Sequence, residues 1–374
     1  MSRVRFGLIG TGFIGRTHAI ALNAAGAVFG ERFAPVCELL ADHTEETAQR
    51  GARALGFARS TGDWRQLIAD PAVDVVDICT PNHLHRDMAL AAIGAGKHVW
   101  CEKPLANTAR EAREIAAAAD AAGVRHLMGF NYICNPLLQV ARDMIAAGEL
   151  GDVYAFRGSY LEDYMSDPAV PWSWRCDRAL AGSGALADLG SHLINLGHFL
   201  LGAVARVNGR LQVVHRTRRD PATGATRAVE NEDIARALIE FANGVPGTFE
   251  VSRVATGLKC GLAFAVFGTR GALEFDQERM NELRWYDAAA GGARRGFRTL
   301  LAGPEHPDYR PFCPAPGHGL GYNDLKVIEA RNLLRAVAGG APAWPDFHEG
   351  ARVQAVMEAI EASHASGAWT DVGA

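Results

Sequence analysis

The first third of the chain alternates short apolar runs with segments of helical character. Apolar runs cover residues 4–9, 34–41 and 73–79, and a fourth ends near residue 101. Between them, residues 16 to about 23, 44–56 and 88–95 have the alanine- and glutamate-rich composition or length of helices. Because strand alternates with helix, we predict an α/β domain, a Rossmann-type doubly wound parallel sheet.

From residue 204 the pattern changes to closely spaced strands. Strand-like runs recur at residues 206–215, 234–241, 246–254, 260–268 and 272–275, and N-G and T-R-G sequences between them are turn signals. No long helices separate these runs, which predicts an α+β domain with a large, mostly antiparallel open sheet. Helices are expected at residues 137–147, 324–338 and 348–364. A chain of 374 residues suggests about two domains, and we predict a first domain at 1–129 and a second at 130–374.

Composition then narrows the partners. The chain is 48% hydrophobic and 21% charged with a formal net charge of −4, so it lacks the basic surplus of nucleic-acid or anionic-membrane binding proteins. Its seven cysteines form no C-x-x-C pair, which favours a reduced protein over a disulfide scaffold or a zinc site. The first strand leaves no room for a signal peptide, and no apolar run approaches the ~18 residues that span a bilayer. We expect a cytoplasmic protein without a metal, a nucleic-acid partner or a membrane segment.

A glycine motif follows the first apolar run. Gly10, Gly12 and Gly15 stand at G-x-G-x-x-G spacing, between a predicted strand and a predicted helix. In this context the first glycine permits a tight turn, the second lets a pyrophosphate approach the backbone, and the third lets helix pack on strand. The phosphates would bind the N–H groups of the helix N-terminus. We predict a dinucleotide site here that includes Phe13 and Ile14.

The end of the second apolar run indicates which dinucleotide binds. Asp42 stands there, and an acid at this point accepts hydrogen bonds from the adenosine ribose and repels a 2′-phosphate. No arginine or lysine follows until Arg50. Glu38 is the rival acid, but it lies inside the apolar run. We therefore predict NAD, with NADP less favoured.

Further polar residues follow the third and fourth apolar runs. The sequence T-P-N-H-L-H occupies residues 80–85, and E-K-P begins at residue 102. Ligands of doubly wound sheets bind beyond the carboxyl ends of the strands, where these residues should meet. They complete the predicted cofactor-binding set with Thr80, Pro81, Asn82, His85, Glu102 and Lys103.

Four motifs in order resemble the glucose–fructose oxidoreductase/inositol dehydrogenase (Gfo/Idh/MocA) family. They are the glycine motif, T-P-N-x-x-H, E-K-P-L-A and G-A-L-A-D-L-G-S-H at residues 184–192. The resemblance implies a pyridine-nucleotide dehydrogenase of sugars, inositols or similar polyols, whose catalytic set maps onto Lys103, Asp188 and His192. The family often has an arginine two residues after Asn131, where this chain has Ile133, so a sugar contact at that position is not carried over.

Two segments of the second half are candidates for substrate binding. Residues 161–178 mix aromatics, acids and arginines with two prolines, which suits a loop that stacks on sugar faces and bonds hydroxyls; covering a neighbouring subunit is the alternative. Residues 316–323 are glycine-rich, and His318 and Tyr322 are candidates there. The predicted substrate-binding set is Lys103, Asn131, Tyr132, Trp172, Trp174, Arg175, Asp188, His192 and Tyr322.

These residues suggest oxidation of a secondary ring hydroxyl to a ketone. Asp188 and His192 stand four apart, which places them on one helix face, although this spacing alone is also typical of a surface pair. His192 is our choice of general base, with Asp188 holding its tautomer or binding a substrate hydroxyl. Lys103 would stabilise the developing alkoxide, and the roles of Lys103 and His192 are exchangeable.

The substrate class and the assembly are predicted more broadly. The tryptophans of residues 161–178 favour an uncharged cyclic polyol or pyranose, with inositols, aldoses and anhydrosugars such as levoglucosan as candidates. Two alternatives remain open: an NAD-dependent glycosidase of the same family, and a non-catalytic NAD(H)-binding sensor. A broad open sheet needs its outer face covered, and the family covers it by self-association, so we expect a homodimer or homotetramer.

Overall fold

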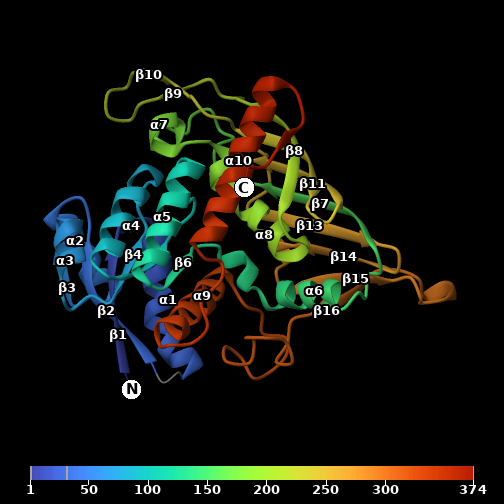
Figure 1. Ribbon diagram of the computed structural model, residues 1–374, viewed down its shortest axis with the longest axis horizontal. Coiled ribbons are helices and arrows are strands. Elements are labelled where there is room, and N and C mark those ends of the chain that lie inside the picture. The colour runs from blue at the N-terminus through green and yellow to red at the C-terminus, as the bar shows by residue number, and fades with distance from the viewer. Residues whose placement is uncertain (1, 31–32, 374) are drawn as a thin grey trace. The chain divides into compact units, whose positions relative to one another are not determined.

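The computed structural model of this chain describes residues 2–30 and 33–373. It divides into two compact units (Figure 1). The first contains Met1–Cys134 and Gly321–Ala351, and the second contains Asn135–Leu320 and Arg352–Ala374. None of the helices in the described ranges is both long enough and apolar enough to cross a bilayer.

The first unit contains the predicted doubly wound sheet. Six parallel strands lie in the order β3-β2-β1-β4-β5-β6, so the direction of winding reverses between β1 and β4. Their bounds are β1 Ser2–Ile9, β2 Phe33–Ala41, β3 Arg59–Thr61, β4 Val75–Ile78, β5 His98–Cys101 and β6 His126–Met128. All four residues of β4 are buried, as a parallel strand covered on both faces requires. The Rossmann prediction is confirmed.

The α-helices of the first unit include some with side-chain caps at their starts and glycines at their ends. They are α1 Phe13–Phe29, α2 Glu45–Leu55, α3 Trp64–Ala69, α4 His85–Gly94, α5 Ala109–Ala122 and α9 Tyr322–Val337. The side chain of Thr44 caps α2 and that of Thr108 caps α5, while Gly56 and Gly123 end these helices in the left-handed region. Helix α1 extends to Phe29, beyond its predicted end near residue 23, and Gly26 lies within it. A Cβ at Gly26 would meet only Pro35, at 3.8 Å.

The second unit contains a nine-stranded sheet in the order β16-β15-β14-β13-β7-β12-β11-β8-β17. Every neighbouring pair is antiparallel except β12 and β7, which confirms the mostly antiparallel prediction. The strands are β7 Val153–Leu161, β8 Val204–Gln212, β11 Ile234–Phe241, β12 Pro246–Ser252, β13 Gly261–Gly268, β14 Gly271–Asp276, β15 Glu282–Asp287, β16 Arg298–Leu301 and β17 Thr370–Asp371. The sequence had indicated no strand at the position of β16.

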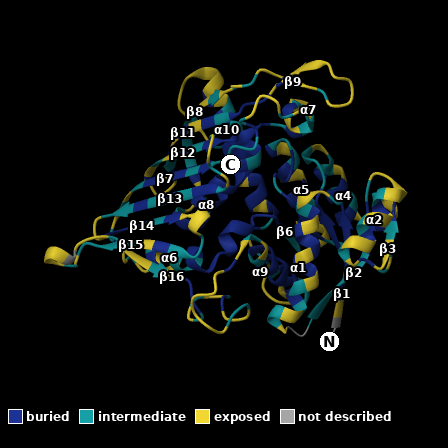
Figure 2. Ribbon diagram, turned by 180° about the vertical axis from the view of Figure 1, so that it is seen from behind, coloured by how far each residue is buried: buried dark blue, intermediate teal, exposed yellow. Residues whose placement is uncertain are grey.

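Helices and one hairpin complete the second unit. Helices α6 Pro136–Ala146, α7 Arg178–Ala181 and α8 Ser191–Leu201 belong to it, as does most of α10 Phe347–Ser366. The hairpin pairs β9 Thr217–Arg219 with β10 Thr226–Ala228, and its tip is exposed (Figure 2). Phe156 and Tyr160 of β7 are buried while Arg157 is exposed, so this strand has one inner and one outer face.

One segment belongs to a different unit from the one that its place in the sequence suggested. Residues 321–351, which the prediction of a 130–374 domain includes, pack with the first unit instead. The reason is helix α9, which lies against α1 (Figure 1) and buries Leu325, Ile328 and Leu333. Hydrophobic periodicity reveals such a buried face but not which layer it packs against.

Candidate active site

The glycine motif forms an open cradle at the start of α1. Gly10 has φ 103°, and a Cβ there would lie 2.6 Å from the carbonyl oxygen of Cys79. A Cβ at Gly15 would clash with the carbonyl of Gly10, whereas one at Gly12 would meet nothing within 4 Å. Gly12 is also the N-cap of α1, and no side chain caps the helix there. The helix N–H groups are thus open to an anion, which is the fit that a pyrophosphate requires. Phe13, 75% exposed, and Ile14 follow at the same edge.

Asp42 lies beside this cradle at the end of β2. Its Oδ2 accepts hydrogen bonds from the N–H of Thr11, at 3.1 Å, and from the Thr11 hydroxyl, and its Oδ1 accepts one from the N–H of His43. Burial acts to raise the pKa of Asp42, but the bonds from Thr11 and His43 outweigh it and lower the pKa below its usual value. The side chain is therefore an anionic acceptor, as recognition of a ribose requires. The rival acid, Glu38, is paired with Arg59 at 2.9 Å.

His85 connects the loops that follow β4 and β5. Its Nδ1 lies 2.7 Å from the carbonyl oxygen of Pro104, and its Nε2 lies 2.8 Å from that of Thr80. Burial lowers the pKa of this fully buried histidine. The predicted role of His85 at the cofactor edge stays a prediction, but these contacts give it a structural part in joining the two loops. Pro81 and Asn82 lie in the first of them, at the turn Asn82–Leu84.

Glu102 follows β5 and points into the protein. It is 4% exposed, and its Oε1 lies 2.9 Å from Nε2 of His18 and 2.5 Å from Nζ of Lys326. Its Oε2 accepts a hydrogen bond from the backbone N–H of Lys103 at 3.2 Å. Burial acts to raise the pKa of Glu102, but the charge of Lys326 and the bond from His18 hold it well below the usual range. The lysine side chain of the E-K-P motif is half-buried. Binding of a cofactor by Glu102 itself stays a prediction.

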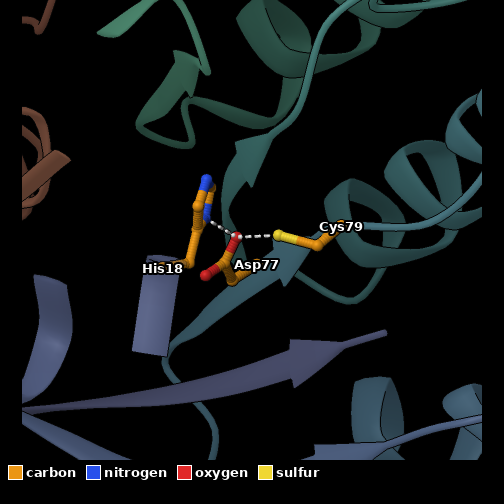
Figure 3. A group of neighbouring side chains, drawn as sticks. All are labelled: His18, Asp77 and Cys79. Atoms are coloured by element: carbon orange, nitrogen blue, oxygen red, sulfur yellow. Dashed lines mark hydrogen bonds and ion pairs between the residues drawn. The ribbon is translucent and has the colours of Figure 1, made fainter. Parts of the chain in front are cut away.

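His18, Asp77 and Cys79 gather three potential metal donors in the first unit (Figure 3). Oδ1 of Asp77 lies 2.8 Å from Nδ1 of His18 and 3.5 Å from Sγ of Cys79. The donor atoms thus bond to one another instead of facing a common centre. Burial raises the pKa of the Cys79 thiol well above its usual value, which disfavours the thiolate that a metal would bind. The expectation of no metal stays a prediction.

In the second unit, Asp188 and His192 lie on either side of a change of helix type. Asp188 belongs to a π-helical turn, Leu186–Gly190, and His192 to the first turn of α8. A π turn is wider than an α turn, so the pair does not have the simple i,i+4 relation that the sequence predicted. His192 is 8% exposed, and the ring of Tyr160 meets it edge-on at 6.1 Å. Single π turns inside helices are frequent at functional sites.

Tyr164 is a site residue that sequence reasoning missed. Its hydroxyl donates a hydrogen bond to Oδ2 of Asp188 at 2.6 Å, and Nε of Arg175 lies 3.9 Å from the same oxygen. Burial, and then the charge of Asp188, raise the pKa of Tyr164 well above its usual value, so the phenol stays a donor. Its place in the aromatic and acidic segment 161–178 was the available signal. The predicted residue Arg175 is thus brought to Asp188.

Buried polar groups form hydrogen bonds with the backbone of Arg175 and with the turn that carries Asp188. Nδ2 of Asn231 donates to the carbonyl oxygen of Arg175 at 2.9 Å, and Nη1 of Arg253 donates to the same oxygen at 3.1 Å. Arg253 also forms an ion pair of 2.8 Å with Asp233, with exposures of 1% and 0%. Glu232 accepts the N–H of Leu186 at 2.8 Å, where the π turn begins. Residues 231–233 and Arg253 therefore fix both Arg175 and the turn that carries Asp188.

The two tryptophans of the loop have different surroundings. Nε1 of Trp172 donates to the carbonyl oxygen of Ala228 at 3.0 Å, and the guanidinium of Arg227 lies 3.3 Å from its ring centroid. Trp172 therefore packs against the β9–β10 hairpin. Trp174 instead lies under the guanidinium of Arg175, at 4.6 Å. A contact of either residue with substrate stays a prediction.

Three predicted residues of the first unit, Phe13, Tyr132 and Tyr322, have neighbouring aromatic rings. Asn131 and Tyr132 lie in the turn Asn131–Cys134, 1% and 5% exposed. The ring of Tyr322, at the start of α9, lies 6.0 Å from that of Tyr132 and 6.2 Å from that of Phe13. Tyr322 thus stands beside the cradle. His318 belongs to the second unit, where its ring faces the carbonyl of Pro316 at 3.2 Å.

Comparisons with known proteins agree with this geometry. Residues 4–130 match "Oxidoreductase family, NAD-binding Rossmann fold", and residues 138–274 match "GFO/IDH/MocA C-terminal domain". The protein is therefore an oxidoreductase with an NAD-binding Rossmann domain. The chain belongs to the Gfo/Idh/MocA family, and the predicted family, fold class and cofactor are confirmed.

Relatives of known activity include dehydrogenases of sugars and polyols. Levoglucosan dehydrogenase of Pseudarthrobacter phenanthrenivorans is 39% identical over 385 residues, covering 100% of this chain and 99% of the relative. The scyllo-inositol 2-dehydrogenase (NAD(+)) of Bacillus subtilis is 28% identical, covering 72% and 73%. A solved levoglucosan dehydrogenase in complex with NADH and levoglucosan superposes with a TM-score of 0.97 at 39% identity, covering 100% of both chains. The predicted enzyme class, an NAD-dependent sugar or polyol dehydrogenase, is confirmed.

Proposed function

We propose that this enzyme oxidises a secondary ring hydroxyl of an uncharged pyranose to a ketone, with levoglucosan as the first substrate to test. The observation that carries the proposal is the similarity to levoglucosan dehydrogenase along the entire chain, at 39% identity. The aromatic and acidic loop around Trp174 supports it, because such surroundings suit the apolar faces and hydroxyls of a pyranose.

The residues of the first unit fit the cofactor. The open N–H groups at Gly12 would hold the pyrophosphate, and Asp42 would accept hydrogen bonds from the adenosine ribose. An anion at Asp42 repels a 2′-phosphate, so we propose NAD over NADP. When bound, NAD supplies hydride acceptance at the nicotinamide.

The roles of the catalytic set follow from their chemistry. His192 would take the hydroxyl proton, because an imidazole titrates near the working pH. Asp188 would orient the imidazole or a neighbouring substrate hydroxyl, and the bond from Tyr164 fixes its carboxylate. Lys103 would stabilise the alkoxide with its charge. Lys103 and His192 remain exchangeable as the base.

The direct test is absorbance of NADH, with purified protein, NAD and a panel of levoglucosan, aldoses and inositols. We expect steady NADH formation with levoglucosan or another uncharged pyranose, and a much lower kcat/KM with NADP. A matched control is Asp42→Ala, which should reduce the ratio of kcat/KM with NAD to kcat/KM with NADP without changing the preferred sugar. Cleavage of a glycoside without net NADH would instead indicate the glycosidase, and tight NADH binding without any turnover would indicate the sensor.

We also propose a cytoplasmic homodimer or homotetramer that associates through the outer face of the large sheet. That face carries a groove of about 670 Å³ on β7 and β12–β15. Charges of both signs line it, including Arg157, Glu250, Glu274 and Arg284. Because charges of both signs are present, a second copy of this face can offer each of them an opposite charge, as a twofold interface requires. Light scattering of the purified protein tests the proposal, and a monomer at micromolar concentration would contradict it.

A further inference from the structure

The first unit contains a cluster of buried ionisable groups to which the proposed reaction assigns no chemical step. It consists of His18 on α1, Asp77 on β4, Glu102 after β5, and Lys326 and Glu329 on α9. Their exposures are 0%, 0%, 4%, 0% and 1%. Isolated buried charges are costly, so a cluster of this size persists only where its members compensate one another.

The members form one continuous chain of contacts. Asp77 Oδ1 lies 2.8 Å from Nδ1 of His18, whose Nε2 lies 2.9 Å from Oε1 of Glu102. Nζ of Lys326 lies 2.5 Å from the same Glu102 oxygen and 2.7 Å from Oε2 of Glu329. The ring of Trp100 stacks on His18, with centroids 3.9 Å apart. The contacts tie four elements together behind the end of β5.

The charges within the cluster favour a single arrangement. Burial acts to lower the pKa of His18, but the carboxylate of Asp77 outweighs it and raises the pKa, so both ring nitrogens can donate to carboxylates. Burial likewise acts to lower the pKa of Lys326, and Glu102 raises it above its usual value. Burial raises the pKa of Glu329 to about 7. His18 and Lys326 therefore share the Glu102 carboxylate.

The side chain of Glu102 packs tightly against the backbone at Gly129. A Cβ on Gly129 would clash with Oε1 of Glu102 and lie 2.6 Å from its carboxyl carbon, so this carboxylate occupies space that only a glycine leaves. Glu102 Oε2 accepts the backbone N–H of Lys103, and on the other side His85 bonds the carbonyl of Pro104. The backbone that carries the Lys103 side chain is held on both sides.

We propose that the cluster positions Lys103 for the reaction, and that Lys326 and His18 act on turnover through Lys103. The inference rests on the proposed function, in which the ammonium of Lys103 contacts the substrate oxygen. Displacement of a catalytic group by about 1 Å lowers rates by about 10²-fold. Loss of the Lys326 side-chain charge removes one of the two groups that hold Glu102, and so loosens the peptide of Lys103.

The test is a double-mutant cycle on the full chain, measuring NADH production with NAD and the best pyranose of the panel. We expect Lys326→Met to lower kcat by ~10²-fold while the Kd for NADH changes by less than about threefold, because the glycine cradle is untouched. In the Lys103→Met background the same substitution should lower kcat no further, because its target is gone. Lys97→Met is the matched control: its Nζ bonds two carbonyls at the opposite end of β5, and it should leave kcat unchanged.

Several results would overturn the proposal. If the loss of kcat in the double variant equals the product of the two single losses, Lys326 acts independently of Lys103. Normal turnover of Lys103→Met alone would refute the proposed role of Lys103, and it would be recognised in that single variant before the cycle is complete. If Lys326→Met does not fold, the uncharged pair Glu102→Gln/Lys326→Met replaces it. If that pair also fails to fold, the cluster serves folding and the proposal is wrong.

Discussion

The two units support their candidate catalytic residues in different ways. In the first unit, the contacts behind Lys103 come from helices and strands that are distant in the sequence; Lys326 and Glu102 are 224 positions apart. In the second unit, the support beneath Arg175 and Asp188 comes largely from the short segment 231–233 and from Arg253. Both place buried charges under a functional side chain.

The two groups of buried charges differ in how they respond to the loss of one charged residue. In the cluster behind Lys103, the Glu102 carboxylate lies beside both His18 and Lys326, so the loss of one of them leaves it the other. The ion pair of Asp233 and Arg253 has one member of each sign, so removal of either leaves a buried charge unpaired. We therefore expect the second unit to be more sensitive to a single substitution.

The largest effect is expected at this buried pair. Arg253→Met leaves Asp233 buried without its cation, which should lower the free energy of unfolding by about 3–5 kcal/mol. The matched control is Arg236→Met: Arg236 on β11 pairs with Glu250 on β12 at 2.8 Å, but both side chains are exposed, and the loss should be about 0–1 kcal/mol. Urea unfolding measures both. Equal losses would contradict the contrast between buried and exposed pairs.

A smaller effect is expected at Tyr164. Tyr164→Phe removes the bond to Asp188 and keeps the ring, and a hydrogen bond to a charged group contributes about 1.5–3 kcal/mol. We expect kcat/KM to fall by roughly ten-fold or more, and the free energy of unfolding to fall by no more than the contribution of this one bond, about 1.5–3 kcal/mol. Tyr154→Phe, at a tyrosine 56% exposed, is the control. An unchanged kcat/KM would mean that Tyr164 does not orient Asp188.

The smallest effect is a pH dependence of stability at Glu329. Burial raises the pKa of Glu329 to about 7 from an ordinary 4.5, so the folded state binds its proton more tightly than the unfolded state does. This contribution to stability is fully present below pH ~4.5 and is lost as the pH rises through about 7. Glu329→Gln, which is neutral at every pH, should lose less stability than the wild type between pH 5 and pH 8. Identical pH profiles in urea unfolding would be evidence against this shift.

Local sequence patterns predicted those parts of the fold that depend on neighbouring residues. The glycine motif between a strand and a helix, and Asp42 at the end of β2, were both predicted as the structure shows them. The packing of α9 with the first unit was not predictable in this way, because a buried helix face does not specify its partner. The cluster behind Lys103 was missed for the same reason.

The candidate site of the second unit was predicted only in part. The family resemblance gave Asp188 and His192, but the π turn between them depends on hydrogen bonds of the type i→i+5, which have no simple sequence signal. Tyr164 lay within the predicted substrate loop, yet nothing distinguished it from the loop's other aromatic residues. Its bond to Asp188 is a tertiary contact.

The most direct test of the central claim is the kcat of His192→Ala beside that of the wild type, with NAD and the best pyranose of the panel. A general base contributes about 10²–10⁴-fold to the rate, so we predict a loss in that range with NADH still bound at the wild-type affinity. His198→Ala, on the same helix α8, should retain normal turnover. A near-normal kcat for His192→Ala would contradict the proposal that this histidine is the base.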